Sequence, residues 1–343
     1  MPCSAVAAVI DIGAGLIACL GTRALIPLLR RAAVIDRPNE RSSHAVPTPR
    51  GGGIAPVAAI LLAWLTLIAF GFATPRLSYA LAGAVLLAAV SLLDDLRGLS
   101  PAPRLFAQAA AVICGMLAEI PAGAVFQGWL PHWLDVLAAL LAWLWFVNLF
   151  NFMDGIDGLA GSEAAAIAAG LVLFATVGVG QDPGLAALSG AAALAAIGFL
   201  VWNWAPARVF LGDVGSVPLG FLLGFLLLDT AARGHWKLAL ILPLYFLADA
   251  TLTLLRRLLS GERIWQAHRQ HFYQQAVRRG LGHAAVTGRV IAANLLLIGC
   301  GWAAENGAGT YALAAAIAVV LLLLANLAGI RPPHDISGNR NSR

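Results

Sequence analysis

Residues 148–161 read N-L-F-N-F-M-D-G-I-D-G-L-A-G and join two long apolar runs, at about 133–150 and 164–180. Polar side chains recur there at every third position, namely Asn148, Asn151, Asp154 and Asp157. A three-residue step drifts by about 60° on an α-helix and hardly at all on a 3₁₀ turn, so these groups share one side. Two amides and two carboxylates therefore crowd the end of an apolar segment. Ionisable groups beside hydrocarbon are costly and are usually kept for function.

The composition indicates a membrane protein. The chain has 343 residues, of which 60% are hydrophobic and 11% are charged, and its mean hydropathy is +0.83. These values exclude an ordinary soluble globular protein. Apolar stretches of spanning length recur along the whole sequence, which predicts an all-α, polytopic bundle of transmembrane helices. We expect residues 1–343 to form a single integral-membrane domain, with residues 331–343 as a flexible cytoplasmic tail.

The hydrophobic pattern predicts about eleven spans. They cover about 5–29, 54–73, 77–93, 105–122, 133–150, 164–180, 185–204, 217–230, 238–255, 290–304 and 311–330. The run at 217–230 is short, but including it with the N-terminus outside places 18 of the 22 lysine and arginine residues in inner loops. This asymmetry follows the positive-inside rule and predicts a cytoplasmic C-terminus. The net charge of +5 is therefore a topology signal, and we expect no nucleic-acid partner.

Two adjacent carboxylates, Asp94 and Asp95, lie at the inner end of the third expected span, in the motif S-L-L-D-D-L-R-G-L-S-P (91–101). The C-terminal end of a helix disfavours anions, and neighbouring carboxylates repel each other. A cation must offset this charge, and the candidates are Arg97, Arg104 or a metal ion. A solvated acidic loop end is the alternative.

Two further inner segments carry acids. Asp154 and Asp157 repeat the placement of an acid at the inner end of a span, and a tight turn capped by Asn and Asp is the alternative. Asp213, in F-L-G-D-V-G-S (210–216), precedes an outward-running span, where a helix N-terminus favours anions or where it acts only as a cap. Three acidic clusters on one membrane face favour a shared site.

Two basic inner loops accompany these acids. One contains H-R-Q-H (268–271), whose histidines would share a helix face and suit phosphate better than zinc, because no third ligand is obvious. The other ends in R-G-G-G (50–53), which could present a guanidinium and backbone amides to phosphate. Solvated positive-inside residues are the alternative for both. Within the spans, we expect Asp249 to pair with a neighbouring helix.

Carboxylates beside basic loops suit Mg²⁺-dependent chemistry on phosphates. Mg²⁺ takes one or two carboxylates and completes its shell with water and phosphate oxygens, and arginines neutralise charge during phosphoryl transfer. At a lipid boundary, we expect one membrane-borne and one cytosolic substrate. A transporter or flippase is the rival class. Transporters usually place polar groups near the midplane and often in repeated halves, whereas these acids lie at one face.

The motifs together resemble a known family. D-D-x-x-G-L-S (94–100), N-x-x-N-F-M-D-G-I-D-G-L-A (148–160) and N-x-x-x-x-x-x-F-L-G-D-x-G-S (203–216) resemble the polyprenyl-phosphate N-acetylhexosamine-1-phosphate transferases of bacterial glycosyltransferase family 4. This superfamily includes phospho-N-acetylmuramoyl-pentapeptide transferase. The resemblance implies transfer of a sugar 1-phosphate from a UDP-N-acetylhexosamine to undecaprenyl phosphate, with release of UMP and with Mg²⁺ or alternatively Mn²⁺. It also implies a multi-pass protein of the bacterial inner membrane with a cytoplasmic active site, and it leaves a homodimer open.

The resemblance also implies residue roles. Asp94 would deprotonate the lipid phosphate or act as a nucleophile. The implied catalytic set is Asp94, Asp95, Asp154, Asp157 and His271, and the implied metal ligands are Asp213 and Asp157. The expected substrate-binding residues are Asn148, Asn151, Asn203, Phe210, His44, Arg50, His268 and Arg269. Among these, Asn203 and Phe210 match the uridine pocket, and the last four are assigned to the pyrophosphate.

Departures from the family pattern narrow the branch. Tyr273 and Gln274 stand where many members have two further histidines, and Lys237, the only lysine, lies in an expected outer loop. The lysine that the pentapeptide branch uses near the first inner loop therefore has no counterpart. Both differences argue against the peptidoglycan enzyme, which stays the alternative. The segments R-S-S-H…P-T-P-R-G-G-G (41–53) and H-F-Y-Q (271–274) look more like members that initiate O-antigen or another surface glycan. The sugar stays open among GlcNAc, GalNAc, QuiNAc and FucNAc.

Overall fold

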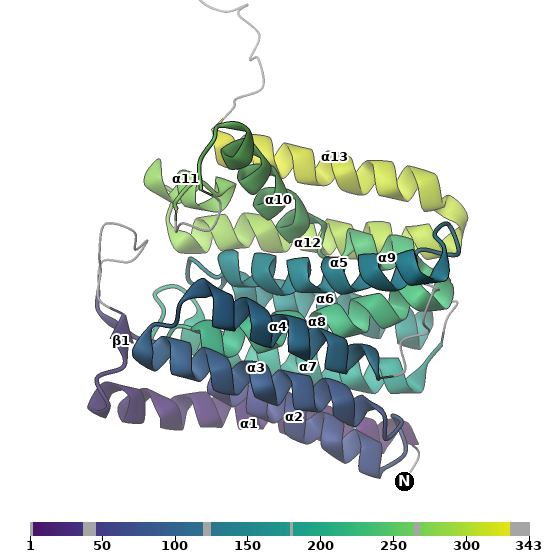
Figure 1. Cartoon of the computed structure of the whole chain (residues 1–343), viewed down its shortest axis with the longest axis horizontal. Coiled ribbons are helices and arrows are strands. Elements are labelled where there is room, and N and C mark those ends of the chain that lie inside the picture. The colour runs from purple at the N-terminus through teal and green to yellow at the C-terminus, as the bar shows by residue number, and fades with distance from the viewer. Residues whose placement is uncertain (1–2, 37–45, 119–124, 179–180, 264–267, 330–343) are drawn as a thin grey trace, which may run out of the picture.

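The computed structural model describes residues 3–36, 46–118, 125–178, 181–263 and 268–329, and most of these residues are helical (Figure 1). The helices are α1 (Cys3–Arg31), α2 (Ile54–Ala69), α3 (Leu77–Arg97), α4 (Pro101–Met116), α5 (His132–Phe152), α6 (Leu159–Val177), α7 (Pro183–Asn203), α8 (Asp213–Thr230), α9 (Trp236–Ile241), α10 (Leu244–Leu259), α11 (Phe272–Arg278), α12 (His283–Ala303) and α13 (Gly309–Ala328). Two short strands, β1 (Ile35–Asp36) and β2 (Thr48–Pro49), pair antiparallel.

Seven helical segments are long and apolar enough to cross a membrane. They are α1, α3, α5, α6, α7, the continuous segment of α8 and α9, and the continuous segment of α12 and α13. The last two are interrupted by the π-helical turns η1 (Ala231–His235) and η2 (Ala304–Ala308). Gly234 and Gly307 adopt φ values of +100° and +96° there, a left-handed conformation that glycine tolerates. The protein is therefore an integral membrane bundle of helices, as predicted.

Each apolar run identified in the sequence contains a helix, but the run at 238–255 is divided. α9 ends at Ile241, and α10 begins at Leu244. Leu242 keeps helical backbone angles, but Pro243 lacks the amide hydrogen that the helix would need there and has non-helical angles itself, so the helix breaks at Pro243. α10 consequently lies at an angle to the other long helices (Figure 1).

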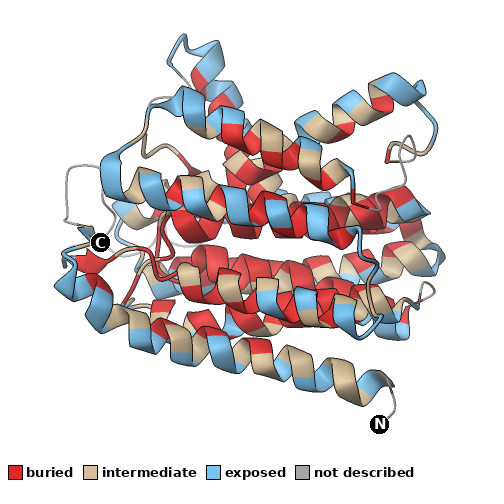
Figure 2. Ribbon diagram, turned by 60° about the horizontal axis from the view of Figure 1, so that its bottom comes forward, coloured by how far each residue is buried: buried red, intermediate tan, exposed pale blue. Residues whose placement is uncertain are grey.

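α8 forms the centre of the bundle. In the window that would cross the membrane, 94% of the α8–α9 residues are buried, against 17% in α1. Figure 2 shows the same contrast between the central helices and the outer ones. α8 packs against α3 and α5, and glycine permits this close approach. A Cβ atom added at Gly220 would lie 2.9 Å from Cβ of Phe150 on α5.

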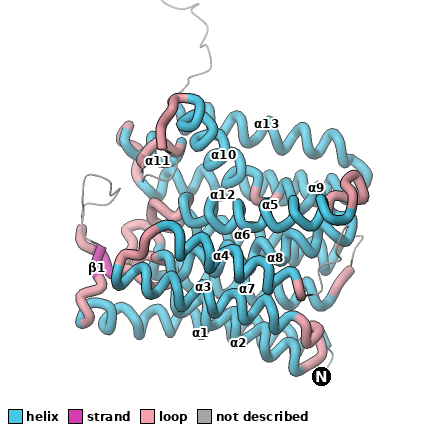
Figure 3. Tube along the Cα trace, viewed as in Figure 1, coloured by secondary structure: helices cyan, strands magenta, loops and turns pink. Residues whose placement is uncertain are grey.

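The direction of successive helices determines where the loops lie. The chain runs back and forth, so the segments 98–100, 153–158, 204–212, 260–263 and 268–282 lie at the end of the bundle that carries β1 and β2 (Figures 1 and 3). We call this end the β1 end. The N-terminus lies at the opposite end. Motifs that are far apart in the sequence therefore meet at one end of the molecule.

Candidate active site

Two arginines lie among the acids at the β1 end. Nη1 of Arg104 is 2.6 Å from Oδ2 of Asp94 and 3.7 Å from Oδ2 of Asp213. Nη2 of Arg50 is 3.3 Å from Oδ1 of Asp95, and it donates a hydrogen bond of 3.0 Å to the main-chain oxygen of Asp95. These contacts join the first inner loop, the end of α3, the start of α4 and the start of α8.

Asp154 belongs to the same group. Burial, together with the nearby carboxylates of Asp213 and Asp95, raises the pKa of Asp154 to about 8. Such repulsion requires that the carboxylates share one small region. Asp94, Asp95, Asp154 and Asp213 therefore form one group, which we call the carboxylate cluster. Two arginines neutralise only part of its charge.

The turn between α3 and α4 places Arg104 beside Asp94. Gly98 ends α3 with φ of +67°, and the backbone amide of Leu99 donates to Oδ1 of Asp94 at 2.6 Å. Pro101 then begins α4, because its fixed φ and missing amide hydrogen suit the first helical position. Arg104 consequently lies in the first turn of α4. Arg97, the other cationic candidate in this motif, is exposed.

The segment 50–53, just before α2, is held against the start of α8. Arg50 forms a parallel bridge with Phe210, and the amides of Gly52 and Gly53 donate to the carbonyl oxygens of Phe210 and Leu211, each at 2.9 Å. The amides of Gly52 and Gly53 are therefore already bonded to the chain, and phosphate binding by this segment stays a prediction for the guanidinium of Arg50. The guanidinium of Arg50 does point to the cluster. Phe210 is half-buried beside it.

The contacts of Asp157 are with residues outside the carboxylate cluster. Its Oδ1 is 3.1 Å from Nδ1 of His283, its Oδ2 accepts the amide of Ala207 at 3.0 Å, and its main-chain oxygen accepts Oγ1 of Thr287 at 2.9 Å. We expected Asp157 among the catalytic acids and the metal ligands. Instead, the structure uses both carboxylate oxygens to join the 153–158 loop to α12 and to the 204–212 loop.

Asn203 also has a structural set of partners. Its Nδ2 donates to the carbonyl oxygen of Val209 at 2.9 Å, and its Oδ1 accepts the amide of Gly158 at 3.0 Å. The side chain is buried, so the expected contact with uridine is not available in this arrangement. Asn203 instead holds two loops of the β1 end together.

The side-chain amides of two asparagines on α5 form hydrogen bonds to neighbouring helices. Asn148 donates to Oε1 of Gln108 on α4 at 2.8 Å, and Oδ1 of Asn151 accepts Oγ of Ser216 on α8 at 2.6 Å. The sequence reasoning missed Gln108, although a polar residue within an apolar run was the available signal. Among the other residues expected to bind substrate, Arg269 is half-buried in the segment just before α11, and His44 lies outside the described residues.

His268 and His271, at the segment that leads into α11, stack on each other. Residues 268–270 are not helical and His271 is the N-cap of α11, so the expected shared helix face is wrong. Their ring centroids are nevertheless 4.9 Å apart, with an angle of 29° between the planes. Burial, followed by the electrostatic effect of the neighbouring His271, Arg257 and Arg256, lowers the pKa of His268 to about 4. His268 is therefore neutral at pH 7.

His271 is held from α10. Its Nδ1 lies 3.2 Å from Oδ1 of Asp249, so the expected pairing of Asp249 is confirmed, with the start of α11 as the partner. The hydroxyl of Tyr273 donates to the main-chain oxygen of Phe152 at 3.0 Å. This contact joins α11 to the end of α5, beside the loop that contains Asp154. The sequence showed Tyr273 only as a departure from a histidine pattern.

The carboxylate cluster can be tested for its fit to a metal. Within the described ranges, no three His, Cys, Asp or Glu side chains already stand as a metal-binding set. Mg²⁺ does not need one, because it takes one or two carboxylates and keeps water or phosphate oxygens as its other ligands. Oxygen donors with uncompensated negative charge fit this ion. Asp94 and Asp95 are each paired with an arginine, at 2.6 and 3.3 Å, whereas Arg104 is 3.7 Å from Asp213, so Asp213 and Asp154 are the members best suited to hold it.

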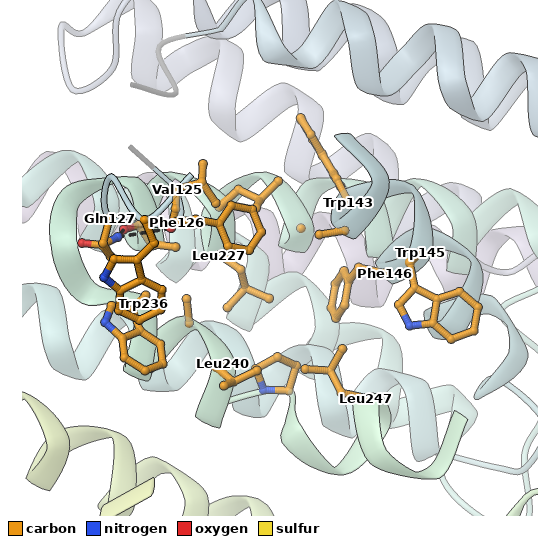
Figure 4. Close-up of a pocket in the computed structure, with 17 residues that line it drawn as sticks. Val125, Phe126, Gln127, Trp143, Trp145, Phe146, Leu227, Trp236, Leu240 and Leu247 are labelled. Carbon is orange, nitrogen blue, oxygen red and sulfur yellow. Dashed lines mark hydrogen bonds between the residues drawn. The ribbon is translucent and has the colours of Figure 1, made fainter. Parts of the chain in front are cut away.

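An apolar pocket of about 370 Å³ lies between α5, α8, α9 and α10 (Figure 4). Aromatic and aliphatic side chains line almost all of it, including Phe146, Trp236, Leu240 and Leu247. Phe146 precedes Phe152, at the β1 end of α5, by six residues, or about 9 Å along a helix. The helix break before α10 forms part of its wall, since Pro243 also lines the pocket.

Comparison with known proteins gives a consistent picture. The sequence model of glycosyl transferase family 4 matches residues 77–231. The decaprenyl-phosphate N-acetylglucosaminephosphotransferase of Mycobacterium tuberculosis is 30% identical over 317 residues, covering 81% of this chain and 78% of that protein. The undecaprenyl-phosphate alpha-N-acetylglucosaminyl 1-phosphate transferase of Escherichia coli is 28% identical over 299 residues, covering 80% and 78%. The phospho-N-acetylmuramoyl-pentapeptide-transferase of Synechococcus elongatus is 35% identical over 228 residues, covering 57% and 58%.

The helix bundle and these relatives define the class, which is that of membrane transferases of the polyprenyl-phosphate sugar-phosphate type. The chain belongs to glycosyl transferase family 4, and the resemblance seen in the motifs is thereby confirmed.

Proposed function

We propose that the protein transfers an N-acetylhexosamine 1-phosphate from a UDP-sugar to undecaprenyl phosphate and releases UMP. The observation that supports this proposal most is the carboxylate cluster with Arg50 and Arg104, which lies where α5 ends. An apolar pocket lies along the side of the same helix. Charged groups for two phosphates and a surface for a lipid chain therefore lie along one helix. The names of the relatives from Mycobacterium tuberculosis and Escherichia coli state a polyprenyl phosphate and the transfer of an N-acetylglucosamine phosphate, which supports the proposal.

In this reaction, a phosphate oxygen of the lipid attacks the β-phosphorus of the UDP-sugar. The bond from that phosphorus to the bridging oxygen breaks, and UMP leaves with the electron pair. Arg104 and Arg50 stabilise the negative charge that the two phosphates bring. Asp94, hydrogen-bonded to Leu99 and to Arg104, is oriented to accept a proton from the acceptor or to attack as a nucleophile. Mg²⁺, held by Asp213 and Asp154, would neutralise the pyrophosphate.

The apolar pocket suits the isoprenoid chain of the acceptor. It begins about two turns of α5 away from the β1 end and extends to Trp236 and Gln127, towards the opposite end of the bundle (Figure 4). A lipid lying there would place its phosphate towards the carboxylate cluster. The pocket lining offers almost no polar group that a sugar or nucleotide could use. The donor is therefore assigned to the loops of the β1 end.

We assign the β1 end to the cytoplasmic face of the bacterial inner membrane. The support is the count of basic residues, because the loops at this end carry most of the arginines. The segment H-F-Y-Q (271–274) and the absence of a lysine near the first expected inner loop further favour an enzyme that initiates a surface glycan such as O-antigen. The relative from Synechococcus keeps the pentapeptide transferase as the second candidate.

The purified protein in detergent tests the reaction. With undecaprenyl phosphate, Mg²⁺ and a panel of UDP-N-acetylhexosamines, we expect UMP release and a lipid product whose mass names the sugar. Omitting the lipid is the control. Protein that binds the lipid but releases no UMP with any donor would favour transport instead. Product formed only from UDP-N-acetylmuramoyl-pentapeptide would favour the peptidoglycan enzyme.

A further inference from the structure

One buried carboxylate outside the cluster has an unusual number of donors. Asp249 on α10 accepts hydrogen bonds from the backbone amides of Phe272 at 3.0 Å and Tyr273 at 3.2 Å, and from the hydroxyl of Tyr245 at 3.1 Å. Its Oδ1 also lies 3.2 Å from Nδ1 of His271. The side chain of Asp249 is fully buried. A buried carboxylate with this many donors is fixed in place.

The ring of His271 is fixed in the same way. Its side chain is only 3% exposed, and Nδ1 faces Asp249. The ring stacks on His268, with centroids 4.9 Å apart, and on Tyr273, with centroids 5.7 Å apart and 19° between the planes. The stacked neighbours and the contact of Nδ1 with Asp249 fix the ring, and the side chain also takes part in a capping box with Gln274 at the start of α11. Nε2 is the ring nitrogen that does not face Asp249.

The position of this pair relates it to the site. Tyr273 donates to the main-chain oxygen of Phe152, two residues before Asp154. Gly155 packs directly on the Tyr273 ring, where a Cβ atom would lie 3.0 Å from Cζ. α11, which begins at His271, is therefore docked on the loop that carries a member of the carboxylate cluster. Asp249 holds the beginning of this helix from 22 residues earlier in the chain.

We propose that Asp249 is a positioning residue for His271. Its carboxylate accepts a hydrogen bond from Nδ1, which selects the tautomer in which Nε2 is free to accept a hydrogen bond from a substrate group or to hold a proton there. This proposal rests on the proposed transferase function. The proposal goes beyond that function, because it assigns a role to Asp249, an acid inside the bundle that touches no substrate. A purely structural alternative is that Asp249 only caps α11.

A double-mutant cycle separates these two roles. We expect Asp249→Asn to lower kcat about 10- to 100-fold and His271→Gln to lower it at least as much, within the range of general acid–base groups. If Asp249 acts through His271, the double variant matches His271→Gln within about twofold. The control is Thr253→Val, which removes a hydroxyl 3.4 Å from Oδ1 of Asp249 and leaves the imidazole contact. We expect it to keep kcat within about twofold of wild type.

Two results would overturn the positioning role. One is a double variant whose losses multiply, as they would if Asp249 only stabilised the fold. The other is a loss in Asp249→Asn that His271→Gln does not share. The KM for the UDP-sugar is measured alongside, and we expect it to change less than kcat. Thermal unfolding in detergent shows which variants are folded.

A second measurement does not depend on activity. With ¹⁵N-labelled histidine, NMR of the wild-type protein at about pH 8.5, where histidine is usually neutral, reports which ring nitrogen carries the proton. His271→Gln assigns the signal. A proton on Nδ1 supports the proposal, and a proton on Nε2 overturns it. Absence of UMP release by wild type would refute the transferase function alone, because the tautomer still tests the pairing.

Discussion

Arg104 joins two acids that belong to different motifs. It contacts Asp94 at the end of α3 and Asp213 at the start of α8, and its side chain is 34% exposed. Solvent screens such a pair, so its contribution to folding stability is small. Its effect on a bound phosphate is larger, because the arginine is held in place before the substrate arrives. Arg104 therefore acts mainly on the charge of the site.

We expect Arg104→Gln to lower kcat/KM at least about 100-fold, equivalent to about 3 kcal/mol of transition-state stabilisation. Arg97→Gln is the matched control, since Arg97 carries the same charge in the same motif and is exposed. It should retain activity near wild type. Initial rates of UMP release measure both variants. Equal losses in the two would show that general positive charge matters, and not the contacts of Arg104.

Asp157 and Asp213 provide a contrast at the same scale. Asp157→Asn and His283→Gln each break the same contact, so both should lower the unfolding temperature by about 2–5 °C while most of kcat remains. Asp213→Asn should instead abolish turnover with little change in unfolding temperature. Unfolding in detergent and UMP release are measured together. A folded but inactive Asp157→Asn protein would return Asp157 to the catalytic set.

The start of α2 and the start of α8 are two elements that meet without side chains between them. A Cβ atom added at Gly53 would lie 2.7 Å from the carbonyl oxygen of Leu211 and 2.8 Å from the amide nitrogen of Gly215. These are backbone atoms, which cannot rotate away. The contact holds the loop of Arg50 beside the first turn of α8, where Asp213 lies. Glycine is therefore required at this junction.

Gly53→Ala should separate these elements. We expect a loss of about 1–3 kcal/mol in stability, together with a lower kcat, because Arg50 and Asp213 shift relative to each other. Gly288→Ala in α12 is the control, since nothing lies within 4 Å of its added Cβ atom, and alanine favours a helix. Unfolding temperature and UMP release are compared for both. Wild-type behaviour of Gly53→Ala would show that the junction is looser than this packing implies.

At the scale of the whole molecule, charge and apolar surface are separated along the bundle. The carboxylate cluster lies at the β1 end, and the apolar pocket lies further along α5, between α8, α9 and α10. α8 joins the two regions, because it begins at Asp213 and lines the pocket with Leu227. A lipid phosphate and a nucleotide sugar can therefore approach the same acids from different directions.

This separation predicts a selective effect in the pocket. Leu247→Trp narrows the pocket on the α10 side, so we expect the KM for undecaprenyl phosphate to rise at least about tenfold, or about 1.4 kcal/mol. The KM for the UDP-sugar should stay near wild type. Leu252→Trp, on the same helix but exposed outside the pocket, is the control. An unchanged lipid KM in Leu247→Trp would remove the pocket from the acceptor site.

Local pattern identified a large part of this protein. Apolar runs showed the helices, and the positions of Asp94, Asp95, Asp154 and Asp213 at run ends predicted that acids would meet at one face. This works because the hydrocarbon thickness fixes helix length and so forces the loops to alternate between two ends. Pro243 was also visible in the sequence. The break that it causes was nevertheless missed, because the hydropathy of the run continues across it.

Partners that depend on the direction of a single side chain were decided only by the tertiary structure. The sequence offered Arg97 and Arg104 equally, and the turn at Gly98 brought only Arg104 back to Asp94. The sequence placed Asp157 in the same series as Asp154, yet the carboxylate of Asp157 contacts His283 on α12. Spacing along a chain fixes which face a residue shares with its neighbours. The packing of helices that are distant in sequence decides which groups touch, because only the folded bundle brings their atoms within hydrogen-bond distance.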